Sequence, residues 1–363
     1  MKKIFSLAVL LLTCATLSAQ FPGGGRTPNP NANLVSVEAN ADGSATFRIY
    51  APNAQNVGLS GDIAAYGTKF EKAENGVWSA TVPNVAAGAY RYNFTVDGIT
   101  VFDPKYPRLN EIKPVTEIVP EGQEMFWQQK DVPHGAVAQV YYKSSTMGTT
   151  RRMHVWTPAG YNASTDALPV FYLIHGGGDN DASWPGVGKA GDILDNLLAE
   201  GKMVPMVVVM PDGSIATDKF VDELANDIIP YIEKNYRVKT DSANRALAGL
   251  SMGGLETMES FMAHPDLFGY INVMSSGWFT NDKKMYEDGE KRLNEIVDTL
   301  NKTAKLLIFT QGGPADIAYE NGKAMLKVFD KCGVKYEYSE MDGGHTWYVW
   351  RHDLYNFAPR LFK

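Results

Sequence analysis

The chain has 363 residues, 44% hydrophobic and 21% charged, so it can bury a sizeable core and is long enough for one large domain and a smaller one. Its formal net charge of −7 at pH 7 argues against nucleic acid as a partner. Its two cysteines and six histidines form no HExxH motif and no paired Cys/His spacing, so the sequence predicts no metal site.

Residues 1–19 are typical of a secretory signal. Lysines precede an apolar run from Ile4 to Leu12, and small residues lead to Ala19. This run is too short to span a bilayer, and no later segment has the composition of a membrane span. We therefore expect an exported protein, periplasmic or extracellular. The residues before Cys14 fit a lipoprotein signal poorly, so a lipid-anchored form is the less favoured alternative.

The next hundred residues predict a linker and a small β-domain. Residues 20–33 are rich in Gly, Pro and Asn, as in a linker. Apolar and polar residues then alternate in short segments, the pattern of half-buried strands. Asp97-Gly98 predicts a type I′ hairpin, because glycine tolerates the positive φ of that turn. We expect a β-sandwich over residues 34–120 and a second linker over residues 121–132.

From residue 133 onward the pattern is that of an α/β domain. Continuous apolar blocks such as "PVFYLIHGGG", "MVVVMPDG", "RALAGLSMGG", "YINVMSSG" and "KLLIFTQGG" predict strands buried on both faces of a parallel sheet. Helical patterns lie between them, and residues 218–236 carry an apolar stripe that Pro230 is expected to kink. The alternation predicts a three-layer α/β domain over residues 133–363.

The stretch "ALAGLSMGGLE" contains a candidate nucleophile. Gly249 to Gly253 match G-x-S-x-G, with a strand pattern before Ser251 and a helical pattern after it. Such an elbow needs small neighbours, because the serine occupies a strained turn in which adjacent Cβ atoms would clash. Ser251 is therefore the predicted nucleophile.

A serine hydroxyl needs a base, and in this fold the histidine follows last in the chain. His345 lies in "EMDGGHTW", a Gly-Gly loop between a strand pattern and the last helix. The competing histidines downstream, His264 and His352, both lie in helical patterns. We therefore predict that His345 takes the proton of Ser251.

The third member should be a carboxylate that follows the strand "KLLIFTQGG" and orients the histidine. We choose Asp316 over Asp342, which is only three residues from the histidine, and over Glu320, which falls in the following helix. Another acid remains an open alternative. The predicted oxyanion donors are the backbone N–H groups of Met252 and of Gly177, which lies in the Gly-rich loop of "LIHGGGDN".

Residues 133–363 resemble the esterase D-like group of carbohydrate esterase family 1, which includes feruloyl and acetyl xylan esterases. The motifs are "LIHGGGDNDASW", "VVVMPDG", "ELANDIIPYIEKNYRV", "ALAGLSMGG" and "GGHTWYVWRHDL". The resemblance implies an α/β-hydrolase fold, a triad of Ser251, Asp316 and His345, no cofactor, and cleavage of feruloyl or acetyl esters of plant cell-wall polysaccharide such as arabinoxylan. The acid segment, "QGGPADIA", departs from the tighter Gly-x-x-Asp usual in the family.

Residues 34–120 resemble an Ig-like carbohydrate-binding module of family 48, on the segment "FRIYAPNAQNVGLSGD". The following residues, "GDIAAYGT", lack the tryptophan of the family's usual Gly-Asp-Phe-Asn-x-Trp. Trp78 and Tyr92 are candidates for stacking on sugar rings, although aromatic residues that alternate in strands also form cores. The sequence leaves open whether this domain binds carbohydrate.

Three tryptophans follow predicted site segments: Trp184, Trp278 and Trp347. We predict that they line a pocket for an aromatic acyl group or a sugar. Two other functions stay open. An enterochelin-type siderophore esterase would need a ring of Lys and Arg around the site for its charged catecholate substrate, and a glycan-binding protein without activity would not turn over esters.

Overall fold

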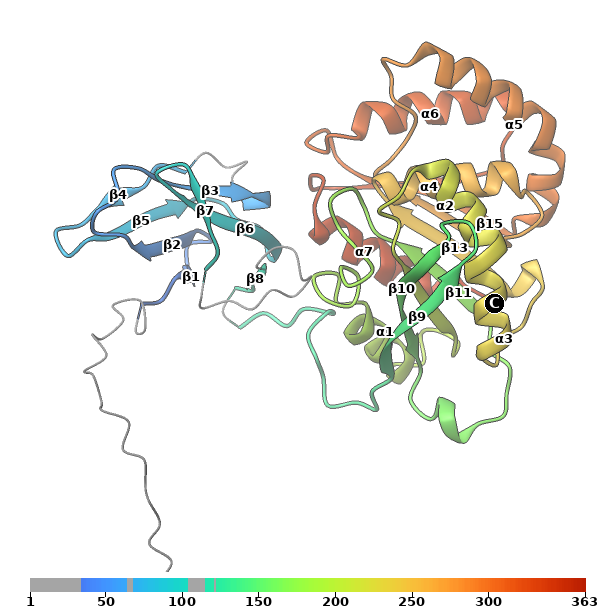
Figure 1. The fold of residues 1–363 in the computed structure, drawn as a ribbon, viewed down its shortest axis with the longest axis horizontal. Coiled ribbons are helices and arrows are strands. Elements are labelled where there is room, and N and C mark those ends of the chain that lie inside the picture. The colour runs from blue at the N-terminus through green and yellow to red at the C-terminus, as the bar shows by residue number, and fades with distance from the viewer. Residues whose placement is uncertain (1–33, 64–67, 104–114, 121) are drawn as a thin grey trace, which may run out of the picture.

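The computed structural model describes residues 34–63, 68–103, 115–120 and 122–363. The predicted signal segment and the first predicted linker lie outside these ranges. Figure 1 shows a β-sandwich beside a larger α/β domain, with β6 and α7 near the boundary between them. Within the described ranges, none of the helices combines the length and the apolar composition of a membrane-spanning segment.

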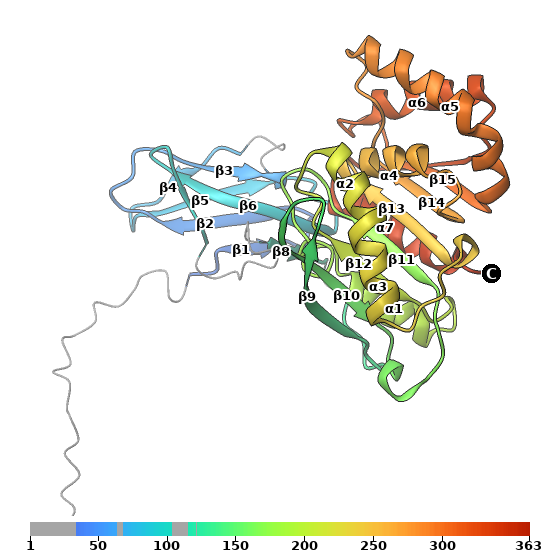
Figure 2. The ribbon, with the colours of Figure 1, turned by 45° about the vertical axis from the view of Figure 1, so that its right-hand side comes forward.

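The first domain, here called the front module, contains two antiparallel sheets. One sheet has the order β1-β2-β5-β4, and in the other β6 pairs with β3, β7 and β8. The two sheets form separate layers (Figure 2), and the rings of Phe47 and Tyr92 meet between them with centroids 5.3 Å apart. The strands are β1 (Val37–Ala39), β2 (Ala45–Tyr50), β3 (Val57–Gly61), β4 (Glu71–Lys72), β5 (Val77–Val82), β6 (Gly88–Val96), β7 (Ile99–Val101) and β8 (Val115–Ile118).

The predicted hairpin is confirmed, and the predicted stacking surface is not. Asp97 and Gly98 join β6 to β7 with φ of 47° and 84°, as a type I′ turn requires. Trp78 and Tyr92, however, lie in the core of the sandwich. Tyr92 is fully buried and donates its hydroxyl proton to Asp103 Oδ2 at 2.7 Å. Neither ring is therefore free to stack on a sugar.

The second domain has one mixed sheet of eight strands, in the order β16-β15-β14-β13-β11-β12-β10-β9. The six strands from β11 to β16 run parallel, as their continuous apolar blocks predicted, and β10 and β9 complete one edge in antiparallel pairing. The strands are β9 (Ala136–Ser144), β10 (Thr149–Thr157), β11 (Val170–Ile174), β12 (Val207–Pro211), β13 (Arg245–Leu250), β14 (Tyr270–Met274), β15 (Leu306–Gly312) and β16 (Glu337–Met341).

Helices cover both faces of this sheet. Side chains of β11 alternate between two cores: Tyr172 faces the one shared with α2 to α6, and Leu173 faces the one shared with α1 and α7. The helices are α1 (Ala190–Ala199), α2 (Thr217–Glu223), α3 (Ile229–Asn235), α4 (Met252–Ala263), α5 (Lys283–Thr303), α6 (Tyr319–Cys332) and α7 (Trp347–Phe357). Short 3₁₀ turns are η2 (Tyr161–Ala163), η4 (Ser242–Asn244) and η5 (Ala358–Arg360).

The helical segment with Pro230 is interrupted in a way that the sequence did not specify. Between α2 and α3 the chain forms a π-helical turn, η3 (Leu224–Ile228). Pro230 lies in the first turn of α3, directly after this π-helical turn. The wider π turn therefore accommodates the proline while the apolar stripe stays on the sheet.

The second predicted linker packs against the α/β domain. Trp127 is buried in the core that contains α7, and its ring lies under the Arg351 guanidinium, 4.9 Å from the centroid. Arg351, itself fully buried, pairs with Glu117 of β8 at 2.6 Å. The front module is therefore attached to the α/β domain by buried contacts as well as by the chain.

Candidate active site

Ser251 stands in a sharp turn between β13 and α4. Its φ of 55° and ψ of −115° place it in a strained region for a residue with a Cβ. The turn is held by two hydrogen bonds: Ser251 N–H donates to the carbonyl of Met274 at 2.9 Å, and Ser276 Oγ donates to the carbonyl of Ser251 at 2.6 Å. The main chain thus keeps the serine hydroxyl in place at the carboxyl end of the sheet.

The glycines around Ser251 are required by close backbone contacts. A Cβ on Gly249 would lie 2.1 Å from the carbonyl oxygen of Gly253, and one on Gly253 would lie 2.3 Å from that of His175. Backbone atoms at these positions cannot move aside without moving the strand or the helix. The small residues of G-x-S-x-G therefore have the steric cause expected from the sequence.

Ser251, His345 and Asp316 form a continuous hydrogen-bonded row. The Ser251 hydroxyl lies 2.8 Å from His345 Nε2, and His345 Nδ1 lies 2.7 Å from Asp316 Oδ1. A carboxylate can only accept, so Nδ1 carries the proton and Nε2 is left as the acceptor for the serine. These three residues come from three loops at the same edge of the sheet, after β13, β15 and β16.

Asp316 is fixed as a hydrogen-bond acceptor. Its carboxylate also accepts from the N–H groups of Ala318 at 2.8 Å and Gly312 at 3.3 Å. Burial by itself would raise the pKa of this carboxyl, but the hydrogen bond and charge of His345 together with the backbone donor hold it below the ordinary value. A buried carboxylate that accepts from N–H groups at both oxygens can stabilise a positive charge on the imidazole.

The loop of His345 is tied to the loop of Asp316. Gly313 N–H donates to the carbonyl of Gly343 at 3.0 Å, and Gly343 has a φ of 144° that a residue with a Cβ rarely adopts. The His345 ring stands edge-on to Trp350, with centroids 5.0 Å apart. The imidazole orientation is therefore set by packing as well as by its two hydrogen bonds.

The Gly-rich loop after β11 lies against the start of α4. A Cβ on Gly177 would be 3.1 Å from Met252 Cγ, and one on Gly176 would be 3.1 Å from Ser251 Cβ. The two predicted oxyanion donors therefore belong to neighbouring segments beside the serine. His175, in the same loop, is buried and accepts from Gly213 N–H at 2.9 Å, which gives it a structural hydrogen bond rather than access to substrate.

The three tryptophans are not at the surface, which corrects the expectation that they line a pocket. Trp184, Trp278 and Trp347 are each 1% exposed or less. Trp184 donates to the carbonyl of Ile174 and meets Trp347 edge-on, and Trp278 donates to Glu259 at 3.2 Å. These rings are close to the site in sequence, but they pack into the core, because burial of their large apolar surface stabilises the fold.

The cavity next to His345 lies between the two domains. It has a volume of about 670 Å³ and is lined on one side by the loop of His345 and on the other by Asp62, Tyr90 and Arg91 of the front module. Smaller hollows adjoin Ser251 and the Gly-rich loop. The sequence did not point to the front-module residues, because nothing in an alternating strand pattern says which neighbouring domain a side chain will meet.

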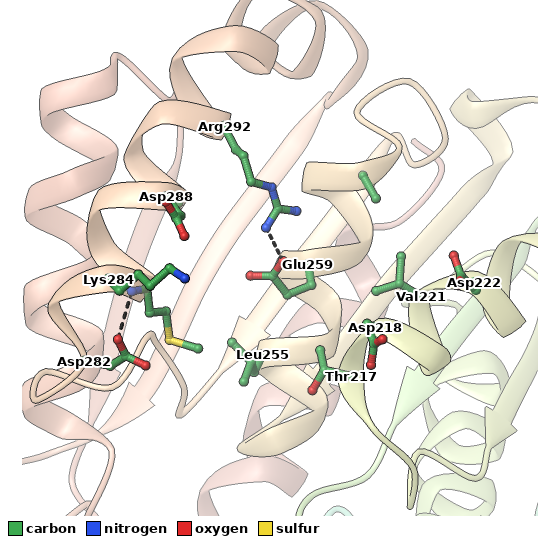
Figure 3. A pocket seen from close by; sticks show the side chains of 13 residues that line it. Thr217, Asp218, Val221, Asp222, Leu255, Glu259, Asp282, Lys284, Asp288 and Arg292 are labelled. Carbon is green, nitrogen blue, oxygen red and sulfur yellow. Dashed lines mark hydrogen bonds and ion pairs between the residues drawn. The ribbon is translucent and has the colours of Figure 1, made fainter.

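A second large cavity lies away from the hydrogen-bonded row. It has a volume of about 580 Å³ and is bounded by α2, α4 and α5 (Figure 3). Arg292 of α5 pairs with Glu259 of α4 at 2.6 Å across it, and several further carboxylates line its wall. Ser251, His345 and Asp316 do not line it. Among the described residues, no cluster of three or more His, Cys, Asp or Glu side chains is arranged to hold a metal ion.

Family models match a segment in each of the two domains. The Esterase family ("Putative esterase") matches residues 144–361, and carbohydrate-binding module 48 (isoamylase N-terminal domain) matches residues 35–106. An endo-1,4-beta-xylanase/feruloyl esterase of Xylanibacter ruminicola is 33% identical over 99% of this chain, and the chain spans 50% of that relative's length.

Two solved structures show the same architecture. A CE1 ferulic acid esterase from Anaeromyces mucronatus aligns with a TM-score of 0.57 at 22% identity, over 65% of this chain and 93% of that one. The enterobactin esterase of Shigella flexneri aligns with a TM-score of 0.66 at 16% identity, over 88% and 93%. At these identities the likeness concerns the fold, and it confirms the predicted α/β-hydrolase fold.

Proposed function

Because the chain belongs to the Esterase family, whose model matches more than half of its residues, we propose that it is an exported serine carboxylic-ester hydrolase. Its proposed substrates are feruloyl or acetyl esters of plant cell-wall polysaccharide such as arabinoxylan. One observation carries the activity: Ser251, His345 and Asp316 form an unbroken hydrogen-bonded row at the end of the sheet. The polysaccharide substrate is supported by the similarity to a xylanase/feruloyl esterase and by the carbohydrate-binding-module family of the front module.

In the first half of the reaction Ser251 Oγ attacks the ester carbonyl while His345 Nε2 takes its proton. Asp316 accepts from Nδ1 and stabilises the imidazolium. The oxyanion of the tetrahedral intermediate accepts from the N–H groups of Met252 and Gly177. His345 then returns the proton to the leaving sugar oxygen, the carbon–oxygen bond breaks, and an acyl-serine remains.

In the second half a water molecule takes the place of the sugar. His345 removes one of its protons, the hydroxide attacks the acyl carbonyl, and a second oxyanion forms in the same hole. When this intermediate collapses, the proton on His345 goes to Ser251 Oγ, and the free carboxylic acid leaves. The reaction consumes one water and needs no cofactor.

The position of the largest site cavity agrees with a bulky leaving group. Because His345 protonates the leaving oxygen, the alcohol must leave on the histidine side, and the cavity of about 670 Å³ opens there. A simple alkyl alcohol would leave most of it empty. We therefore expect esters of a sugar to be better substrates than alkyl esters, because contacts remote from the carbonyl help to position it.

The charge of this cavity argues against a siderophore ester. An iron-loaded tricatecholate is strongly anionic and needs several free cations. Among the described residues that line the cavity, Arg91 is the only Lys or Arg, and it is already paired with Asp62 and Asp179. Asp342 adds a negative charge to the same wall. The fold likeness to an enterobactin esterase therefore does not extend to the charge expected for such a substrate.

The proposal is tested by measuring release from four esters: feruloylated arabino-oligosaccharide, methyl ferulate, acetylated xylan and a ferric catecholate ester. We expect the highest kcat/KM on one of the two sugar esters. Ser251→Ala should lower turnover by about 10³-fold or more, while Ser339→Ala, on the exposed surface of β16, should leave it unchanged. Fastest hydrolysis of the catecholate ester would assign the protein to siderophore processing. No turnover of any ester would leave a glycan-binding protein.

A further inference from the structure

An arginine of the front module reaches the loop that carries one of the oxyanion donors. Arg91 lies on β6, and its guanidinium donates to both carboxylate oxygens of Asp62, at 2.9 and 3.1 Å. Its remaining terminal nitrogen donates to Asp179 of the α/β domain. Arg91 is 9% and Asp179 4% exposed, so this pair crosses the boundary between the two domains in a buried position.

Asp179 belongs to the turn that contains Gly177. Its N–H donates to the carbonyl of Gly176 at 3.2 Å, which closes the turn over the glycines, and its own carbonyl accepts from Ser214 Oγ at 2.8 Å. Within this turn Gly178 has a φ of 76°, a conformation that glycine adopts readily. The position of the Gly177 N–H is therefore linked to the position of Asp179.

The Asp179 carboxylate has Arg91 as its cation. A buried carboxylate without a partner is strongly unfavourable, more so than the ion pair is favourable. If Arg91 were removed, the Asp179 carboxylate would have a lower free energy in contact with solvent than in its buried position. Its movement toward solvent would displace the glycine turn as well. A donor displaced from the oxyanion loses much of its contribution to the rate, about 10²- to 10³-fold for one donor.

We propose that Arg91 is a positioning residue for the oxyanion hole, through which the front module holds the Gly177 turn in its catalytic geometry. The inference rests on the proposed esterase function. It makes the front module a part of the catalytic apparatus, in addition to any contact with carbohydrate. It therefore applies to esters that are too small to reach the front module.

The experiment compares kcat and KM for p-nitrophenyl acetate in the full chain. Arg91→Met should lower kcat about 100-fold. KM should stay within threefold of the wild-type value, because the small substrate does not contact the carboxylates of Asp62 and Asp179. Adding Asp179→Asn to this variant should restore kcat at least tenfold, because the unpaired charge buried at Asp179 is then removed. Arg48→Met is the matched control: Arg48 pairs with Glu38 at the surface of the same module, and its removal should leave kcat unchanged.

The outcomes separate the two claims. Turnover by the wild type together with an unchanged kcat in Arg91→Met would overturn the positioning role and leave the esterase function intact. No turnover by the wild type would reject the function itself. If Arg91→Met does not fold, Arg91→Lys decides, because lysine keeps the charge but lacks the fork that holds both aspartates. A loss in kcat alone, of about tenfold, supports the proposal, and an unchanged kcat contradicts it.

Discussion

Replacement of Asp316 by asparagine should nearly abolish turnover, because both oxygens of this carboxylate accept hydrogen bonds from N–H groups. One oxygen accepts from His345 Nδ1 at 2.7 Å and from Ala318 N–H at 2.8 Å, and the other faces Gly312 N–H at 3.3 Å. An amide has one NH₂ group, which must point at a donor in either orientation. If it faces the histidine, it stabilises the tautomer with the proton on Nε2, which cannot accept from Ser251.

We expect a loss of about 10⁴-fold in kcat, the size known for the wrong histidine tautomer in such triads, which corresponds to about 5 kcal/mol in the activation free energy. Steady-state hydrolysis of a p-nitrophenyl ester measures it, with the melting temperature recorded to show that the fold persists. Asp342→Asn is the matched control. Asp342 is exposed and borders the cavity next to His345, so the kcat of this variant should stay within threefold of the wild-type value. A greater loss in Asp342→Asn than in Asp316→Asn would refute the assignment of the acid.

Three further predictions concern stability. Gly249→Ala should destabilise the protein by more than about 3 kcal/mol, because the new Cβ would overlap a backbone carbonyl. Gly191→Ala is the control: its new Cβ would have no atom nearer than 3.5 Å, so this variant should melt at or above the wild-type temperature. Burial raises the pKa of Asp353 to about 7; the folded state then holds this proton more tightly than the unfolded state between about pH 4 and 7, so stability falls as pH rises through that window. In Asp353→Asn the free energy of unfolding, measured with urea, should no longer fall between pH 5 and pH 8. An equal fall in the variant and the wild type would contradict this prediction. Trp184→Ala should lower the free energy of unfolding by about 3–5 kcal/mol, because it leaves a cavity. The preference for sugar over alkyl esters should not change. A changed preference with an unchanged melting temperature would show that the ring contacts substrate.

The sequence alone predicted the features that depend on local geometry. The glycines around Ser251 follow from the sterics of a single turn, and the continuous apolar blocks follow from burial of parallel strands on both faces. The hairpin at Asp97-Gly98 needs only two residues with positive φ. Asp316 was distinguished from Asp342 by the order of strand and loop, and the structure brings Asp316 to His345.

The tertiary structure decided what each large or charged side chain touches. Proximity in the chain placed Trp184 and Trp347 near the site, but their rings turn into the core, because a side chain's direction depends on how its helix or loop packs. Arg91 and Asp179 are 88 positions apart, in two domains that the sequence describes as separate patterns. Their contact exists only once the sandwich docks on the α/β domain, and no local rule of propensity or spacing specifies the face on which two folded domains meet.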